Sequence, residues 1–160
     1  MRKGAGIIYL NTNVMFTSQL TLESRLIECD DDTTFVIKAN NTNCAASLEF
    51  YGTPEEFKEF ADELVDFPKT IDQEVHYPPR SRYDSSVNYA YWLTIKVFCY
   101  DPSGHVALEI SIGNKEVQPW NYQSRFCIQT DAATLNRFGQ RLRGWDAKSC
   151  ARISLYEERE

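Results

Sequence analysis

A stretch of about twenty residues recurs in this chain, 78 positions further on, with its apolar pattern intact. Eight positions match in character between the copies, and no gap separates them. An internal repeat indicates a duplicated supersecondary unit, so the fold must contain the same piece of structure twice. The matched positions are Leu48, Phe50, Thr53, Phe57, Phe60, Ala61, Leu64 and Phe67 in the first copy, and Phe126, Ile128, Asp131, Leu135, Phe138, Gly139, Leu142 and Trp145 in the second.

The second part of each copy predicts a helix. In the first copy, Thr53 is a candidate cap, Pro54 occupies the first helical position, and Glu56 completes a capping box three residues after Thr53. The apolar positions of residues 54–66 follow helical spacing, which predicts one buried stripe that packs on a sheet.

In the second copy, Asp131 is the predicted cap and Gly144 marks the end of the helix. The small residues Ala61 and Gly139 occupy equivalent positions. We expect them to let each helix lie close to the strands beneath it.

Turn signals divide the first part of each copy into three strands. The tetrapeptide 101–104, Asp-Pro-Ser-Gly, is the clearest of them. Alternating and β-branched residues between the turns predict strands. The expected strands are 20–29, 34–39 and 45–51 before the first helix, 91–100, 106–112 and 125–129 before the second, a closing strand in 151–156, and an edge strand in 6–10.

These elements predict an α+β fold. Two strand-strand-strand-helix units, roughly 20–68 and 90–145, form a mostly antiparallel sheet of about six or seven strands with two helices on one face; a barrel-like curl of the sheet is an alternative. Residues 1–160 are expected to be a single domain. The connector 69–89 has no sustained periodicity and is expected to be a long loop, which in compact domains is often functional.

Composition limits the partners of this chain. Its net charge of −6 opposes binding to nucleic acid or to anionic membranes and favours a basic partner. No signal-peptide core or membrane-spanning segment is recognisable, so a cytoplasmic location is expected. Five cysteines occur without a Cys-x-x-Cys spacing, so neither a disulfide framework nor a zinc site is predicted.

The sequence lacks several common catalytic motifs. It contains no Gly-x-Ser-x-Gly elbow, Walker loop or Gly-x-Gly-x-x-Gly, and its two histidines, His76 and His105, lack metal-ligand spacing. The run of aspartates at 30–32 lacks the spaced ligands of a calcium loop and is interpreted as a hairpin turn. We therefore expect a protein that is not an enzyme and needs no cofactor or metal.

The first candidate binding surface is the acidic first helix, which contrasts with the arginines of the second helix, Arg137, Arg141 and Arg143. One interpretation is that neighbouring helices complement each other in charge, or that each is merely solvated. The other is that the acidic face docks a basic protein. The candidate residues are Glu55, Glu59, Asp62, Glu63 and Asp66.

The second candidate surface combines aromatic residues with arginine, types that are enriched in binding hot spots. The alternative is that these rings cover the ends of the sheet. The candidates are Tyr77, Arg80, Arg82 and Tyr83 in the connector, with His76, Tyr89 and Tyr91 around them, and Trp120 with Tyr122 in the later loop.

The segment Gly104-His105-Val106-Ala107-Leu108-Glu109-Ile110, followed by Pro119-Trp120 and by Phe126 leading into Leu135 and Leu142, resembles a group of small uncharacterised bacterial proteins. The resemblance covers roughly residues 20–145 and rests on turn and core positions. Some members of that group resemble the immunity proteins of bacterial toxin systems. The resemblance implies binding and neutralising a cognate toxin, and it assigns no functional residue.

We therefore expect a small acidic binding protein, most concretely an immunity-type inhibitor that occludes a basic protein such as a toxin. The first alternative is a small-molecule-binding or enzymatic domain that uses the concave sheet face, with His76, His105 and Tyr77 near its mouth. The second is a homo-oligomeric structural module, such as a homodimer, in which the acidic helix of one copy meets the basic helix of another.

Overall fold

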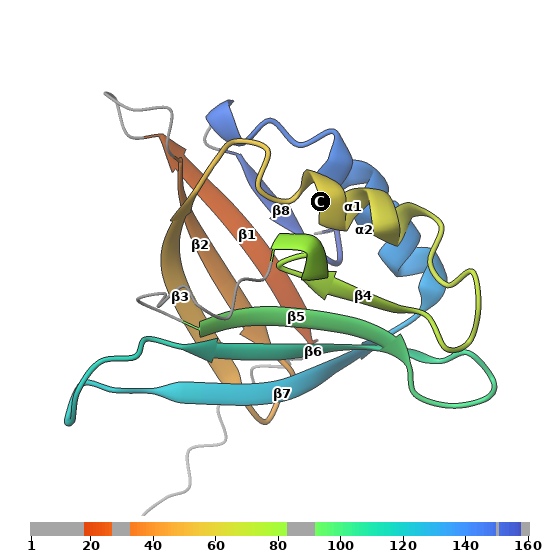
Figure 1. Ribbon diagram of the computed structural model, residues 1–160, viewed down its shortest axis with the longest axis horizontal. Coiled ribbons are helices and arrows are strands. Elements are labelled where there is room, and N and C mark those ends of the chain that lie inside the picture. Colours follow the sequence, from red (N-terminus) through yellow and green to blue (C-terminus); the bar gives the residue numbers. More distant parts are fainter. Residues whose placement is uncertain (1–17, 27–32, 83–91, 150, 158–160) are drawn as a thin grey trace, which may run out of the picture.

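The computed structural model describes residues 18–26, 33–82, 92–149 and 151–157, and these have an α+β fold (Figure 1). Two antiparallel sheets of four strands each are accompanied by two α-helices that lie side by side. Sheet A has the order β3 (Ala45–Gly52), β2 (Thr33–Asn40), β1 (Gln19–Leu26), β8 (Arg152–Ser154). Sheet B has the order β4 (Glu74–Tyr77), β5 (Trp92–Cys99), β6 (Val106–Gly113), β7 (Gln123–Thr130). The helices are α1 (Lys58–Val65) and α2 (Ala132–Arg143), and the 3-10 turns are η1 (Arg80–Arg82) and η2 (Ala147–Ser149).

The prediction of one sheet with six or seven strands is wrong in this detail. A short strand, β4, lies inside the predicted connector and pairs with β5, whereas the closing strand β8 pairs with β1. The strand that follows each helix therefore joins the sheet of the other half. This exchange gives each sheet its fourth strand.

Both halves have the order strand, strand, strand, helix, strand, so the repeated unit is longer than predicted. The third strands are 78 positions apart (Ala45 to Gln123), as are the strands after the helices (Glu74 to Arg152). The second strands are 73 positions apart (Thr33 to Val106). The difference of five residues falls in the turn between the second and third strands.

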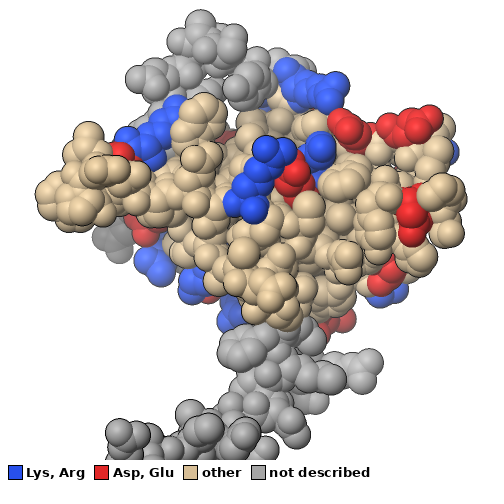
Figure 2. Space-filling view, turned by 90° about the horizontal axis from the view of Figure 1, so that it is seen from below, with Lys and Arg blue, Asp and Glu red and all other residues tan. Residues whose placement is uncertain are grey.

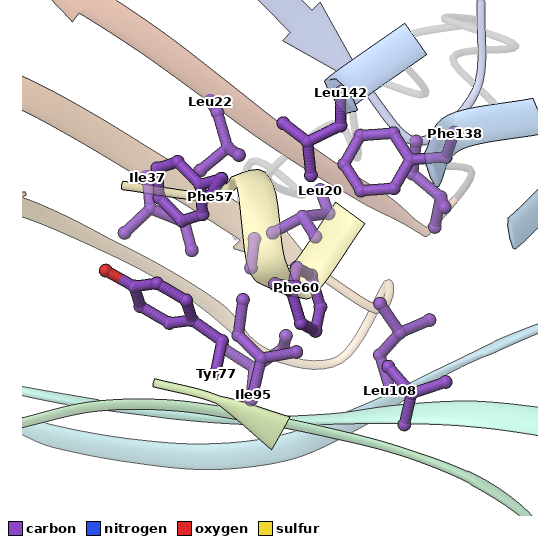
Figure 3. Close-up of a cluster of buried hydrophobic side chains, with 14 of the residues drawn as sticks. Leu20, Leu22, Ile37, Phe57, Phe60, Tyr77, Ile95, Leu108, Phe138 and Leu142 are labelled. Carbon is purple, nitrogen blue, oxygen red and sulfur yellow. The ribbon is translucent and has the colours of Figure 1, made fainter. Parts of the chain in front are cut away.

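One hydrophobic core lies between the two sheets and is closed by the helices (Figure 3). Strand alternation sends every second side chain of each sheet inward, and the apolar stripe of each helix faces the same interior. Figure 3 shows side chains from all three layers directed toward one another, among them Leu22, Ile37, Phe60, Ile95, Leu108 and Phe138.

The two helices begin differently. α2 starts at the predicted cap, because the Asp131 carboxylate accepts hydrogen bonds from the backbone N–H and the hydroxyl of Thr134, both at 2.8 Å. α1 starts at Lys58 and has no side-chain cap, although it was predicted from Pro54. Only one half of the predicted capping box forms, since Glu56 Oε2 accepts from the Thr53 N–H at 3.4 Å.

The small residues in the helices serve a different contact from the predicted one. A Cβ atom at Gly139 would lie 2.7 Å from Leu64 Cβ and 3.1 Å from the Ala61 carbonyl oxygen, so Gly139 allows α2 to approach α1. Next to this crossing, the Asn136 amide donates to the carbonyl oxygens of Leu64 and Phe67 at 2.8 and 2.7 Å. An α2 side chain thereby satisfies the carbonyl end of α1.

Several predicted features lie outside the described residues. These include the predicted edge strand at 6–10, the aspartates at 30–32, and the candidate residue Tyr83. Among the helices in the described ranges, none is long and apolar enough to cross a membrane.

Candidate binding surface

The five predicted carboxylates line the side of α1 that faces away from the core. Phe60, Ala61 and Leu64 turn inward from the same helix and are buried. Helical periodicity separates the two sets, because residues three and four apart share one face. Throughout, the acidic surface denotes Glu55, Glu59, Asp62, Glu63 and Asp66, all of which are exposed.

Arginine from the connector borders the acidic surface. Arg82 in η1 lies 3.8 Å from the Glu59 carboxylate and 3.6 Å from that of Glu56, and its guanidinium donates to the Glu56 carbonyl oxygen at 3.0 Å. The structure thus brings part of the second predicted surface against the first. Because Arg82 is exposed, these ion pairs contribute little to stability and mainly fix the connector beside the helix.

The arginines of α2 are largely committed elsewhere. Arg141 donates to the Ser154 and Leu155 carbonyl oxygens at 2.9 and 3.1 Å, and Arg137 donates to the Thr134 hydroxyl. Arg143 approaches α1, with 3.9 Å between its Nε and the Asp62 carboxylate. The interpretation that neighbouring helices complement each other therefore applies to one pair at the crossing and leaves most of the acidic surface uncompensated.

Glu63 carries a negative charge that its surroundings disfavour. Partial burial raises the pKa of its carboxyl group, and the negative charge of Glu59 raises it further, whereas the positive charges of His76 and Lys69 lower it less. Within the described residues, Glu63 forms no ion pair with Lys or Arg. A positive group placed beside it would relieve this repulsion.

A hollow of about 270 Å³ lies beside Glu63. Besides Glu63 of α1, the hollow is lined by residues of the connector, including the strand β4 within it. These residues are Asp72, Glu74, His76 and Arg80. Glu74 is bonded to His76 and Arg80. The carboxylates of Glu63 and Asp72 are therefore the groups that make the hollow suited to a cationic side chain such as Lys or Arg. The sequence analysis missed Asp72 and Glu74, whose positions next to α1 depend on the pairing of β4 with β5.

Glu74 organises the far wall of the hollow. Its Oε2 atom lies 2.9 Å from His76 Nε2 and 3.0 Å from Arg80 Nη2, and it accepts from both. Arg80 Nη2 and His76 Nε2 also lie 2.9 Å apart. We interpret them as two donors that share Glu74 Oε2 as their acceptor. The bond from His76 lowers the pKa of Glu74, so this carboxylate remains charged at neutral pH.

Tyr77 belongs to the core. Its side chain is 5% exposed, its ring stacks on Phe57 with 4.7 Å between centroids, and its hydroxyl donates to Glu56 Oε1 at 3.0 Å. Alternation along β4 places the preceding residue, His76, on the opposite face. The pattern Glu74-Val75-His76-Tyr77 contained this signal, but it covers only four residues.

The remaining candidates lie elsewhere. Trp120 is 71% exposed in the β6–β7 turn, at the end of the molecule away from the helices (Figure 1). His105 lies in the β5–β6 turn, where its ring bonds to Asp101 and lowers the pKa of that carboxyl group. His76, His105 and Tyr77 therefore do not share a cavity. Within the described ranges, no group of three or more His, Cys, Asp or Glu side chains could hold a metal ion.

Comparison of the chain with protein-family models, with curated proteins and with solved structures found no match.

Proposed function

We propose that this chain is a binding protein that docks a basic protein through the acidic surface and the adjoining hollow, and that it acts as an immunity-type inhibitor. A bound partner would be neutralised by occlusion, because its functional surface would be covered. Such an inhibitor needs no cofactor, since binding supplies the whole effect.

The observation that carries this proposal is the electrostatic state of Glu63. Its carboxylate is partly desolvated and stands next to Glu59, which is unfavourable in the free protein. A Lys or Arg side chain entering the hollow would offset both effects. The free protein therefore holds an arrangement that a cationic partner improves.

The surrounding residues give the surface its shape. Arg80 pairs with Glu74 in the wall of the hollow, which positions this part of the rim before a partner arrives, and Arg82 pairs with Glu59 on the neighbouring face of α1. A preformed rim reduces the entropy lost on binding. The exposed carboxylates along α1 would attract a basic partner over a longer range and accelerate its association at low salt.

A peptide of six arginines is a suitable first probe. Isothermal titration at low salt should show binding, and the double variant Glu63→Gln with Asp66→Asn should weaken it by about three- to tenfold. The matched control is Glu49→Gln with Glu116→Gln, which removes two exposed carboxylates outside the acidic surface. Equal affinity of the two double variants would contradict the proposal.

The inhibitor role requires a separate measurement. Co-expression with a basic toxin that it neutralises should restore growth of the host. The triple variant Glu59→Lys, Asp62→Lys and Glu63→Lys should slow association with that toxin in a salt-dependent way. Association rates equal to those of the unmodified chain would refute the docking surface even if growth were restored.

A further inference from the structure

Among the exposed large hydrophobic side chains of the described residues, the two most exposed lie in one loop. The loop is residues 114–122, between β6 and β7, and it presents Val117 and Trp120 at 70% and 71% exposure. At its base, Tyr122 is 41% exposed, and Trp92, at the start of β5, is 48% exposed. Exposed apolar groups that gather in one region in this way mark interaction sites. This surface, Trp92 with residues 114–122, is termed the tryptophan tip.

The corresponding turn in the other half of the molecule is shorter. This turn, residues 41–44 between β2 and β3, has five residues fewer. In it, Asn41 Oδ1 accepts from the N–H groups of Asn43 and Cys44 at 3.2 and 2.9 Å. The equivalent Asn114 Oδ1 accepts from the N–H groups of Glu116 and Tyr122 at 3.3 and 3.0 Å. Both turns use an asparagine side chain in the same way, and the longer turn carries the exposed residues Val117 and Trp120.

Hydrogen bonds hold the tip in one conformation. Asn114 Nδ2 donates to the Trp120 carbonyl oxygen at 2.8 Å, and the Trp120 N–H donates to the Val117 carbonyl oxygen at 3.0 Å. Tyr122 anchors the loop to sheet A, because its hydroxyl donates to the Ser47 carbonyl oxygen at 2.9 Å. A loop ordered in advance loses little entropy on binding, which favours a contact role over a merely tolerated insertion.

The base of the tip is also packed. The Trp92 ring lies against Gly113, where a Cβ atom would come 3.4 Å from Trp92 Cδ1. Lys115 Nζ sits 4.2 Å from the centroid of the same ring. This cation–π contact orients the lysine stem along the indole and leaves the faces of Trp120 and Val117 open.

Charge separates the tip from the acidic surface. Within the loop, Lys115 and Glu116 cancel, although the chain as a whole carries −6. In Figure 2, which looks at the molecule from below the view of Figure 1, the end at the left is largely uncharged. Figure 1 shows α1, which carries the acidic surface, away from the β6–β7 turn. Two copies can therefore approach through the tip with their acidic surfaces far apart, which limits the like-charge repulsion that opposes self-association.

We propose that the tryptophan tip is a contact between two copies of this chain. In a twofold arrangement the same patch meets itself, so aromatic and apolar groups of one copy cover those of the other without an unmatched charge. This inference goes beyond the proposed binding of a basic protein and leaves the acidic surface of both copies free. It differs from a pairing of acidic and basic helices, because it is apolar.

The size of the patch sets the strength of the contact. The exposed surface of the patch comes from three aromatic side chains and one valine. It amounts to on the order of 400 Å² per copy, since a whole aromatic side chain has about 200 Å² of surface. The total of about 800 Å² is below that of a standard interface and corresponds to a weak dimer. The dimer should therefore form at high protein concentration and dissociate on dilution.

Sedimentation velocity between about 10 and about 500 µM tests this inference. The mass should rise with concentration from 18.5 kDa toward twice that value. Trp120→Ser, alone or with Val117→Ser, should raise the dissociation constant by about tenfold or more. Tyr51→Ser is the matched control, because Tyr51 is an aromatic side chain with 63% exposure on β3, and it should leave the constant unchanged.

Three outcomes would overturn the inference. The first is a monomer across the whole concentration range, and the second is a dimer that Trp120→Ser does not weaken. The third is a dimer that about 1 M NaCl dissociates, because salt screens a pairing of charged helices and does not weaken an apolar contact. Folding of each variant is checked by circular dichroism, and no loss is expected since the replaced side chains are exposed.

A parallel arm separates self-association from insertion into lipid. Vesicles of phosphatidylcholine are sedimented with the unmodified chain and with Trp120→Ser. The contact between copies predicts that neither protein sediments with the vesicles. If the unmodified chain were monomeric and sedimented with the vesicles while Trp120→Ser did not, the loop would bind lipid, and the inference would be wrong.

Discussion

The two halves of this molecule have the same interior and different borders. The third strands, β3 and β7, share one burial pattern residue by residue, and both helices bury their predicted apolar stripes. The helices of the two halves start differently and have opposite charges, since α1 is acidic and α2 is rich in arginine. The turn before the third strand is five residues longer in the second half. The comparison teaches that packing preserved the repeated pattern, whereas the surfaces diverged to carry the acidic surface on one half and the tryptophan tip on the other.

The largest expected effect tests whether the halves contribute equally to one core. Phe60 and Phe138 are equivalent positions, 1% and 0% exposed. Replacing either by Ala should lower the free energy of unfolding by about 3–5 kcal/mol, because a buried ring is removed and a cavity remains. Urea denaturation measures both. A loss below about 1 kcal/mol for one of them would show that its half is not packed into the shared core.

The helix crossing should be less sensitive and unequal between the halves. Gly139→Ala places a Cβ atom against Leu64, and overpacking of this kind costs about 1–3 kcal/mol, of which the better helix propensity of Ala offsets about 1 kcal/mol. At the equivalent position, Ala61→Gly should cost about 1 kcal/mol from propensity. Thermal denaturation of both variants gives the comparison. A Gly139→Ala variant more stable than the original chain would mean that the helices can separate without loss.

The two helix starts provide a smaller and sharper contrast. Asp131→Ala removes a formed cap and should cost about 1 kcal/mol. Thr53→Ala, at the equivalent position, should change stability by less than about 0.5 kcal/mol, since no side-chain cap is formed there. Urea titration of each variant under the same conditions measures both losses of stability. Equal losses would show that Thr53 caps the helix after all.

The smallest effect is the pH dependence of that cap. Hydrogen bonds from Thr134 lower the pKa of Asp131 below its ordinary value of 3.8. A lowered pKa stabilises the folded state above the unfolded pKa, and this contribution is lost as the pH falls through the folded pKa. The stability difference between the original chain and Asp131→Asn should therefore be constant from about pH 7 to pH 5 and change below about pH 4. A difference that is independent of pH would contradict the assigned charge of the cap.

Local pattern was sufficient for the repeat, the buried stripes and the class of the fold. It was insufficient for β4, because only Val75 and Tyr77 alternate inward there, too few to establish a period. The local pattern also did not predict which strands pair, because nothing in the sequence of a strand such as β8 indicates the sheet that it joins. Helical spacing predicted the acidic surface, whereas the hollow beside it needed β4 to bring Glu74 next to Glu63.

The exchange of β4 and β8 has a consequence for how such a chain could originate. A half-length ancestor would have lacked the last strand of its own sheet and could have completed it only by borrowing that strand from a second molecule. The present chain is then the covalent form of an intertwined pair. If the chain were cut between the halves, each polypeptide should lack the fourth strand of its sheet. The two should fold together only when each supplies that strand to the other.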